Sequence, residues 1–357
     1  MEKLTDAQPP EQLITTASSS SGVVRVVRYA DEYREAWDAF VRRSMNGTLF
    51  HLQQFLAYHP PGRFHFHHLL FFEGDRLVAV LPGGLTQNGR HYESPVGASY
   101  GSFVWEDIDA ATALAIVEAF ESYIRELGVQ AVHLTSAPTL YQPVLSQNLE
   151  FALLYKGYAY ERHYISHITQ LGIVSDPQDL FAPIAKRYIK RAYQHYRGIA
   201  IEEVSPDRMI AALTEFYPII VENKARRNAK PTHSLEDLRR LHELLPELMK
   251  LWLLRLDGEL IAGSLIFLPN HRVPLSFYPM MRYEFRDVRP IYVLSAEMMR
   301  WAQRQGYSYF DLGVSQDTSD DNPMTPALPL IEFKEKFHSR GILRSTLAKN
   351  YRSDSAA

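Results

Sequence analysis

The same order of predicted elements occurs twice in this chain of 357 residues. Each half reads as two adjacent strands joined by an acidic glycine turn, then a helix, then a strand. In the first half these elements cover residues 64–72, 76–85, 110–127 and 130–134. In the second half they cover residues 251–256, 260–268, 291–305 and 307–312. The turn glycines and the helix-ending glycines both recur at an offset of about 180 residues, which predicts a duplicated α/β unit. The same order also recurs by chance in α/β proteins.

The duplication predicts two domains with short tails. The GIVSDP stretch at residues 172–177 separates the end of one predicted strand from the next helix and marks the boundary. We therefore expect a disordered tail over residues 1–22, one domain over 23–172, a second over 173–350, and a disordered tail over 351–357.

Composition limits the classes of function. The net charge of −3 argues against a dedicated nucleic-acid binder, and the 46% of hydrophobic residues can fill a core in each half. Cysteine is absent, which excludes disulfides, thiolate metal sites and a cysteine nucleophile. The sequence shows neither a signal peptide nor an apolar run of membrane-spanning length. We expect a cytoplasmic protein, able to work at the inner face of the membrane.

The most informative stretch joins a helix, a strand and a lysine-containing segment. Apolar residues recur at helical spacing over 291–301, Gly306 ends the helix, and a strand over 307–312 delivers Asp311 beside Gly313. A long polar loop follows, and then FKEKF at residues 333–337 begins a short helix.

This order resembles the C-terminal half of the FemAB-like branch of the GNAT acyltransferase superfamily, where a GY-x-YFD-x-G strand precedes an FK-x-x-FG segment. His338 stands where the final glycine of that motif usually lies. Residues 184–201 are similar to the basic helix that leads into the first strand of the family's C-terminal domain. Residues 37–40, 47–50 and 77–82 are similar to its N-terminal half. The resemblance covers about residues 25–350 and implies tandem GNAT-like α/β domains, each a mixed, mostly antiparallel sheet flanked by helices.

Three residues near the strand end are candidates for catalysis. Acyl transfer to an amine needs a deprotonated amine, aligned reactants and a donor for the developing oxyanion. Asp311 could hold or deprotonate the amine, and Glu332 lies nearby in the sequence. Lys334 could stabilise the oxyanion, as the resemblance implies for the lysine of the FK motif. Alternatively, Asp311 caps the loop and Lys334 belongs to a solvated helix face with Glu332.

A cationic helix is the main candidate for binding phosphates. Lys186 and Lys190, and Arg187 and Arg191, are two pairs spaced four residues apart, with no acidic residue among them. Such a face could hold coenzyme A, a lipid-linked pyrophosphate or the acceptor end of a tRNA. A solvated helix face is the alternative.

The expected donor site lacks a feature of GNAT enzymes. Those enzymes hold the pyrophosphate of acyl-coenzyme A on a glycine-rich turn, whereas residues 282–290 supply arginines before a proline. Arg282 and Arg289 are candidate substrate contacts, as is Tyr278. The donor therefore stays open between acyl-coenzyme A and aminoacyl-tRNA. In the first half, Tyr100 on a glycine-containing loop could meet the acceptor, although the loop also fits a plain turn.

The histidines of the first half do not predict a metal site. Alternation along RFHFHH places His65 and His67 on one strand face, with Phe64 and Phe66 on the other, and no carboxylate lies at ligand spacing. A half-exposed strand face is the expected structure.

The favoured function is acyl or aminoacyl transfer to an amine of a cell-envelope or polysaccharide precursor, in a cleft between the two domains. Two alternatives stay open: a coenzyme-A-dependent N-acetyltransferase of a small soluble amine, and a degenerate GNAT-like module that binds a lipid-linked or other phosphorylated substrate without turnover.

Overall fold

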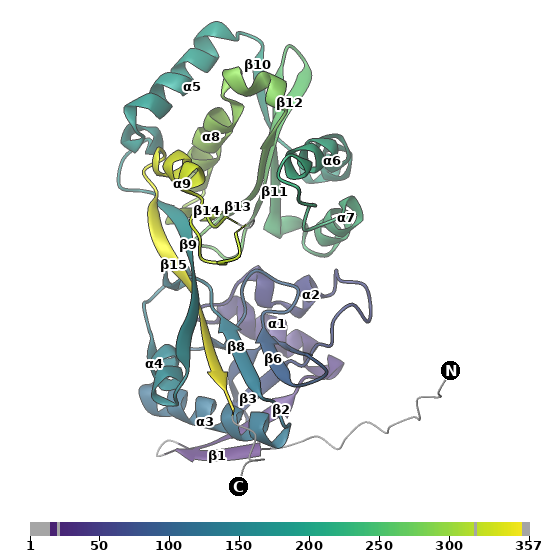
Figure 1. Cartoon of the computed structure of the whole chain (residues 1–357), viewed down its shortest axis with the longest axis vertical. Coiled ribbons are helices and arrows are strands. Elements are labelled where there is room, and N and C mark those ends of the chain that lie inside the picture. Colours follow the sequence, from purple (N-terminus) through teal and green to yellow (C-terminus); the bar gives the residue numbers. More distant parts are fainter. Residues whose placement is uncertain (1–14, 20–21, 318–319, 352–357) are drawn as a thin grey trace, which may run out of the picture.

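The computed structural model describes residues 15–19, 22–317 and 320–351, and the remainder of the predicted tails lies outside these ranges. Two α/β halves lie one above the other, and two long strands run between them (Figure 1). Within the described residues, no helix is long and apolar enough to cross a membrane.

Both halves have the same order of elements. The first contains β2 (Gly22–Arg28), α1 (Arg34–Arg43), α2 (Gln53–Leu56), β3 (Leu69–Glu73), β4 (Arg76–Leu81), β7 (Val104–Trp105), α3 (Ala110–Glu126), β8 (Ala131–Thr135), α4 (Asn148–Tyr155) and β9 (Ala159–Gln170). The second contains β10 (Ile199–Glu203), α6 (Met209–Ala225), α7 (Leu235–Leu244), β11 (Met249–Leu256), β12 (Glu259–Phe267), β13 (Leu275–Met281), α8 (Pro290–Arg304), β14 (Tyr309–Val314), α9 (Leu328–Glu335) and β15 (Arg340–Asn350). This correspondence agrees with the predicted duplication.

Four further elements lie outside this shared order: β1 (Thr15–Ser19), β5 (Gly84–Thr86), β6 (His91–Ser94) and α5 (Pro183–His195). β1 corrects the prediction for the N-terminal tail, because it pairs antiparallel with β2 along its whole length. Backbone pairing to an edge strand needs no apolar pattern in the added segment, so this strand could not be predicted from periodicity.

The strand β13 of the second half has two partners, β12 on one side and β14 on the other. In the first half these two roles fall to separate strands: β7 pairs antiparallel with β4, and β6 pairs parallel with β8. The residues between β6 and β7 form a loop that contains Tyr100. This split divides the strands into a sheet of five and a sheet of ten.

The last strand of each half pairs with the other half. β9 lies between β14 and β15, and β15 lies between β9 and β8, so the ten-stranded sheet runs through both halves. Figure 1 shows these two strands side by side along the length of the molecule. Because each half completes the sheet of the other, the two halves share a backbone hydrogen-bond network. The proposed boundary near residue 172 follows β9 directly.

The core also crosses between the halves. Phe50 packs edge-on against Phe267 with ring centroids 6.0 Å apart, and the Leu49 amide donates to the Pro269 carbonyl at 2.7 Å. One apolar cluster contains buried residues from α1, α2, α6, α7, β11 and β12. Burial of this shared apolar surface stabilises the two halves against separation.

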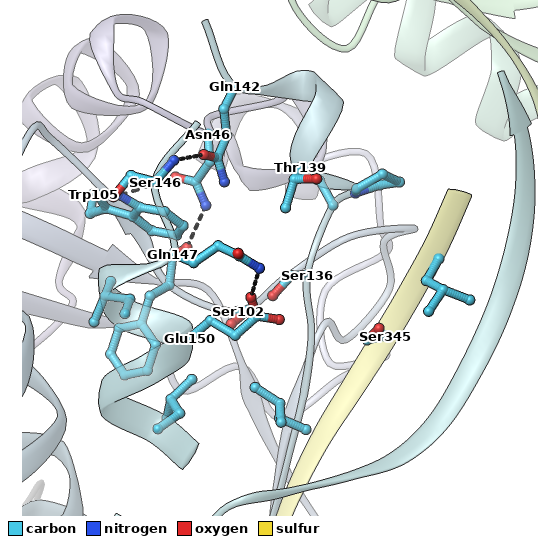
Figure 2. Close-up of a pocket in the computed structure, with 17 residues that line it drawn as sticks. Asn46, Ser102, Trp105, Ser136, Thr139, Gln142, Ser146, Gln147, Glu150 and Ser345 are labelled. Carbon is cyan, nitrogen blue, oxygen red and sulfur yellow. Dashed lines mark hydrogen bonds between the residues drawn. The ribbon is translucent and has the colours of Figure 1, made fainter. Parts of the chain in front are cut away.

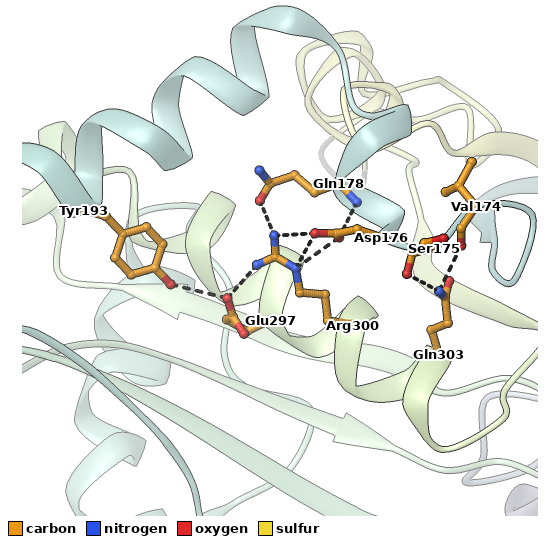
Figure 3. A network of polar contacts seen from close by, with 8 residues as sticks. All are labelled: Val174, Ser175, Asp176, Gln178, Tyr193, Glu297, Arg300 and Gln303. Atoms are coloured by element: carbon orange, nitrogen blue, oxygen red, sulfur yellow. Dashed lines mark hydrogen bonds and ion pairs between the residues drawn. The ribbon is translucent and has the colours of Figure 1, made fainter.

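The segment that joins the halves is held to α8 by Arg300. Its guanidinium donates to Asp176 at 2.8 Å, to Gln178 at 2.9 Å and to Glu297 at 2.8 Å (Figure 3). These side chains are partly buried. The hydrogen bonds from Arg300, together with its charge, lower the pKa of the Asp176 carboxyl. This network explains how the connection between the halves packs against α8.

The helix and strand that lead to the candidate site have the predicted order. α8 starts at Pro290, whose missing N–H is no loss in the first turn, and Gly306 follows the helix at a φ of 82°. β14 then places Phe310 and Asp311 in the interior, each fully buried.

Candidate functional site

Asp311 lies where the two halves meet. Its Oδ1 accepts from the Ser166 hydroxyl at 2.6 Å and from the Gly313 amide at 2.7 Å. Its Oδ2 accepts from the Tyr141 hydroxyl at 2.9 Å, and the Tyr100 hydroxyl is 3.5 Å away. The Gly313 bond is the loop-capping contact that the sequence allowed as an alternative. The three side-chain donors come from elsewhere in the chain and build a carboxylate site that local capping alone would not need.

Burial and hydrogen bonding act on Asp311 in opposite directions. Burial raises the pKa of the carboxyl, while the donated hydrogen bonds and the Lys334 charge lower it, and the net shift is upward. A carboxyl whose pKa is raised takes up a proton more readily than an exposed aspartate does. Such perturbed groups are common at functional sites, although buried structural networks produce them too.

Lys334 holds the end of β14. Its ammonium donates to the carbonyls of Gly313 at 2.7 Å and Val314 at 2.8 Å, and to the Ser315 hydroxyl at 2.9 Å. The side chain is 5% exposed, so the alternative of a solvated helix face is wrong for this residue. Burial lowers the pKa of Lys334 to about 8. To act on an oxyanion, the ammonium would have to exchange one of these three acceptors for the substrate.

A histidine and a serine extend this cluster. His167 Nδ1 lies 3.0 Å from the Ser315 hydroxyl, and both residues are buried. Burial lowers the pKa of His167 to about 4, so the ring is neutral at pH 7. Because Ser315 accepts from Lys334, its own proton is free to go to Nδ1. This pair could not be predicted from the sequence, since β9 and the end of β14 meet only in the folded chain.

Arg344 supplies a cation on the other side of Asp311. Its guanidinium lies 5.5 Å from the centre of the Tyr100 ring and 5.4 Å from that of Tyr164. The Nε atom is buried and has no hydrogen-bond partner among the described residues. Burial lowers the pKa of this guanidinium, and Asp311 acts against that shift. An arginine placed on aromatic rings with unused donors is suited to a carboxylate or phosphate.

Other predicted catalytic and acceptor-binding residues have different positions. Glu332 is exposed on α9, whereas Lys334 on the same helix is buried. Tyr100, expected on a flexible loop, is 2% exposed and belongs to the Asp311 cluster. The structure therefore brings Tyr100, Asp311 and Lys334 into one region and leaves Glu332 at the surface.

The cationic helix is α5. Arg187, Lys190 and Arg191 are exposed on it, while Lys186 bonds the Asp179 carbonyl at 2.6 Å. The opposite side of the helix packs on α8 through Tyr188, whose ring meets that of Tyr292 at 5.2 Å. Three of the four predicted cations are thus exposed on the helix.

The arginines before α8 are spread along the chain rather than gathered around one point. Arg289 has a left-handed backbone, with a φ of 61°, and its guanidinium lies 4.8 Å from the Tyr188 ring centre. Arg282 pairs with Glu259 at 3.5 Å. Tyr278 is buried, and its hydroxyl accepts from the His233 amide at 3.2 Å. Pro290 leaves the first helical position without an N–H, so α8 offers a poorer anion cradle than a glycine turn would.

A polar pocket lies in the first half, beside β15. Its cavity volume is about 70 Å³, and it opens to solvent. Hydroxyl and amide side chains surround it together with the Trp105 ring, and Glu150 is its one acidic lining residue (Figure 2). The labelled polar members are Asn46, Ser102, Ser136, Thr139, Gln142, Ser146, Gln147 and Ser345. Neutral hydrogen-bonding groups beside an aromatic ring suit a polar, uncharged ligand group.

The expected half-exposed histidine strand is wrong. β3 begins only at Leu69, and the preceding residues make a single bridge between Phe66 and Gly84. His67 is buried and lies 2.7 Å from the Tyr123 hydroxyl, whereas His65 is exposed. The alternation of a strand does not apply to residues that lie before the strand begins.

Part of the second half matches a known domain family, and the whole chain shares its fold with solved GNAT-type structures. Residues 185–322 match the family model described as an acetyltransferase (GNAT) domain. The structure of FemX is similar, with a TM-score of 0.64 at 13% identity, covering 89% of this chain and 96% of FemX. No curated protein matches this chain in sequence.

Two further solved structures share the fold. L-PGS from Bacillus licheniformis gives a TM-score of 0.55 at 13% identity, covering 91% of this chain and 92% of the other. A tandem GNAT protein from the clavulanic acid biosynthesis pathway gives 0.52 at 12% identity, covering 93% and 100%. The tandem architecture predicted from sequence is thus confirmed at the level of the fold.

Proposed function

We propose that this chain transfers an acyl or aminoacyl group to an amine of a cell-envelope or polysaccharide precursor. The observation that carries the proposal is the buried Asp311 carboxylate of the second half, held on β14 by the Tyr141 and Ser166 hydroxyls of the first half. The likeness of the whole chain to FemX supports a transferase built on this architecture.

Asp311 acts on the amine through Tyr100. The carboxylate has no exposed surface, but the Tyr100 hydroxyl donates to it and keeps lone pairs of its own. An N–H of the incoming amine can bond that oxygen, and a proton can pass through the hydroxyl to the carboxylate. The amine nitrogen then bonds the acyl carbon as the ester or thioester bond of the donor breaks, and the departing oxygen or sulfur takes the proton from the Asp311 carboxyl, which restores the carboxylate. A carboxyl with a raised pKa favours this uptake of a proton.

Arg344 holds an anionic group of one substrate. Arg344 is half-buried, its guanidinium lies over the Tyr100 ring, and its Nε has no hydrogen-bond partner in the described part of the chain. A carboxylate or phosphate bound to Arg344 would lie beside the amine that hydrogen-bonds to Tyr100. Planar guanidinium recognises both kinds of anion through paired hydrogen bonds.

The donor carries several phosphates and meets the outer face of α5. Arg187, Lys190 and Arg191 are exposed there without ion pairs within the described part of the chain. The Pro290 start of α8 disfavours the pyrophosphate cradle of coenzyme A. Together these features favour aminoacyl-tRNA over acyl-coenzyme A.

Coenzyme-A-dependent N-acetylation is the second candidate. The match of residues 185–322 to an acetyltransferase domain favours it. Tight, stoichiometric binding of acetyl-coenzyme A by calorimetry would reverse the order of the two donors.

The test is product formation by mass spectrometry. Purified protein is given aminoacyl-tRNA or acetyl-coenzyme A, each with amine-bearing peptide, lipid-linked and aminosugar precursors. We expect an amide product with aminoacyl-tRNA that is lost in Asp311→Asn and kept in Asp75→Asn, a matched change in an exposed turn. Binding of a precursor without any product from either donor would instead support the non-enzymatic module.

A further inference from the structure

Three potential metal ligands lie together on the sheet of the first half. His91 and Glu93 come from β6, and His133 comes from the parallel neighbour β8, where it is the register partner of Glu93. One ligand atom from each residue lies within 4.8 Å of the others. No metal was expected from the sequence. His91 and Glu93 lie close together in the chain, but His133 comes 40 residues after Glu93 and joins them only through strand pairing.

The separations are close to those of a tetrahedral site. His133 Nδ1 lies 2.8 Å from Glu93 Oε1, and His91 Nδ1 lies 4.0 Å from that same oxygen. Zinc bonds of about 2.0–2.2 Å at tetrahedral angles require ligand atoms about 3.3 Å apart. Of these two separations, one must therefore lengthen and the other shorten by less than 1 Å. The ligand atoms of His91 and His133 lie within 4.8 Å of each other and must also approach, which imidazole rotation can supply.

A second carboxylate is placed to orient one of the imidazoles. Glu161 Oε1, on β9, lies 3.4 Å from His133 Nε2, the nitrogen that faces away from Glu93. Histidine ligands of metals usually donate their other N–H to a carboxylate, which fixes the tautomer and makes the ligating nitrogen more basic. This second contact points to a ligand site rather than to a chance group of polar residues.

We propose that His91, Glu93 and His133 bind one divalent transition metal ion, with zinc the best match, and that Glu161 positions His133. Two imidazoles and one carboxylate leave a fourth position for water. The ion links β6 to β8 and so stabilises the pairing of these two parallel strands. The site is independent of the proposed transferase reaction.

The test measures zinc binding by the untagged, chelator-treated full chain. Calorimetry with zinc sulfate at pH 7.5 should show one ion per chain, and the ion should raise the melting temperature. His91→Ala and Glu93→Gln should each weaken binding at least tenfold, and Glu161→Gln about tenfold, the usual effect of losing a carboxylate that orients a ligand. His65→Ala, at an exposed histidine outside the cluster, should change nothing.

Several results would overturn the proposal. Absence of zinc uptake by the unmodified chain would mean that His133 simply bridges Glu93 and Glu161 without an ion. Uptake that His91→Ala and Glu93→Gln leave unchanged would place the metal elsewhere. Melting temperatures measured in chelator show whether each variant is folded, and unchanged zinc affinity in Glu161→Gln would remove that residue from the proposal.

Discussion

The Tyr141 hydroxyl donates a 2.9 Å hydrogen bond to Asp311, although the two residues belong to different halves of the chain. Tyr141 lies in a short turn after β8, and Asp311 lies on β14. The bond therefore couples the packing of the two halves to the charge of the candidate site. A change at either end should alter both the stability of the chain and the behaviour of the carboxyl.

Tyr141→Phe tests this coupling. The change removes one donor that lowers the pKa of Asp311, so that pKa should rise further. Loss of a buried hydrogen bond should lower the free energy of unfolding by about 1–3 kcal/mol. Urea unfolding measures the stability, and the acidic limb of the pH–rate profile should move to higher pH. Tyr155→Phe, at an exposed tyrosine, is the control, and equal effects of the two changes would contradict the coupling.

Lys334 should make stability depend on pH in the alkaline range. Burial lowers the pKa of Lys334 from 10.5 to about 8, so the unfolded chain binds the proton more tightly than the folded chain. Stability should therefore rise between pH 8 and pH 10.5, by an amount on the order of 3 kcal/mol for this residue. Because tyrosines also titrate there, the measured quantity is the difference between the unmodified chain and Lys334→Met.

Lys336→Met is the control for this difference in the pH dependence of unfolding. Lys336→Met changes the neighbouring lysine, which is not fully buried, and should keep the alkaline rise. An identical pH dependence of unfolding in Lys334→Met and the unmodified chain would mean that the Lys334 ammonium is not held in the interior as described. Turnover gives a second readout: a role at the oxyanion predicts a loss of roughly 10² to 10³ in Lys334→Met, with substrate binding less affected.

The outer face of α5 predicts a salt-dependent effect on the donor. Charge reversal at Lys190 and Arg191 should weaken binding of tRNA, and the loss should be larger at 50 mM than at 300 mM salt because screening removes the attraction. The matched control reverses the exposed charges of Lys230 and Arg240. Equal losses for the two pairs would show that net charge, and not this face, governs binding.

β9 pairs with β14 of the second half, and β15 pairs with β8 of the first half. The two halves should therefore stay together after the chain is cut. A protease site inserted at residues 173–175 would cut the connection between β9 and α5 while leaving the β9, β14 and β15 pairing intact. The nicked protein should elute as one particle in gel filtration and separate only in denaturant. Dissociation into two folded halves under native conditions would mean that the exchanged strands contribute little.

The sequence predicted the elements whose signals are local. The spacing of apolar residues before Gly306 and the strand ending at Asp311 are properties of consecutive residues, and the structure has both. Ser166, Tyr141 and Arg344 were missed because their role depends on which strands become neighbours. The exchange of β9 and β15 is equally invisible to periodicity, since either pairing partner would bury the same face.

Asp311→Asn in the product assay tests the central claim most directly. Asparagine keeps the size of the side chain but cannot take up the proton, so turnover with aminoacyl-tRNA should fall by at least about 10²-fold, the usual scale for general-base catalysis. The Michaelis constant for the donor should stay within a few-fold of its original value, and urea unfolding would confirm that the variant is folded. A folded Asp311→Asn protein with unchanged turnover would contradict the account.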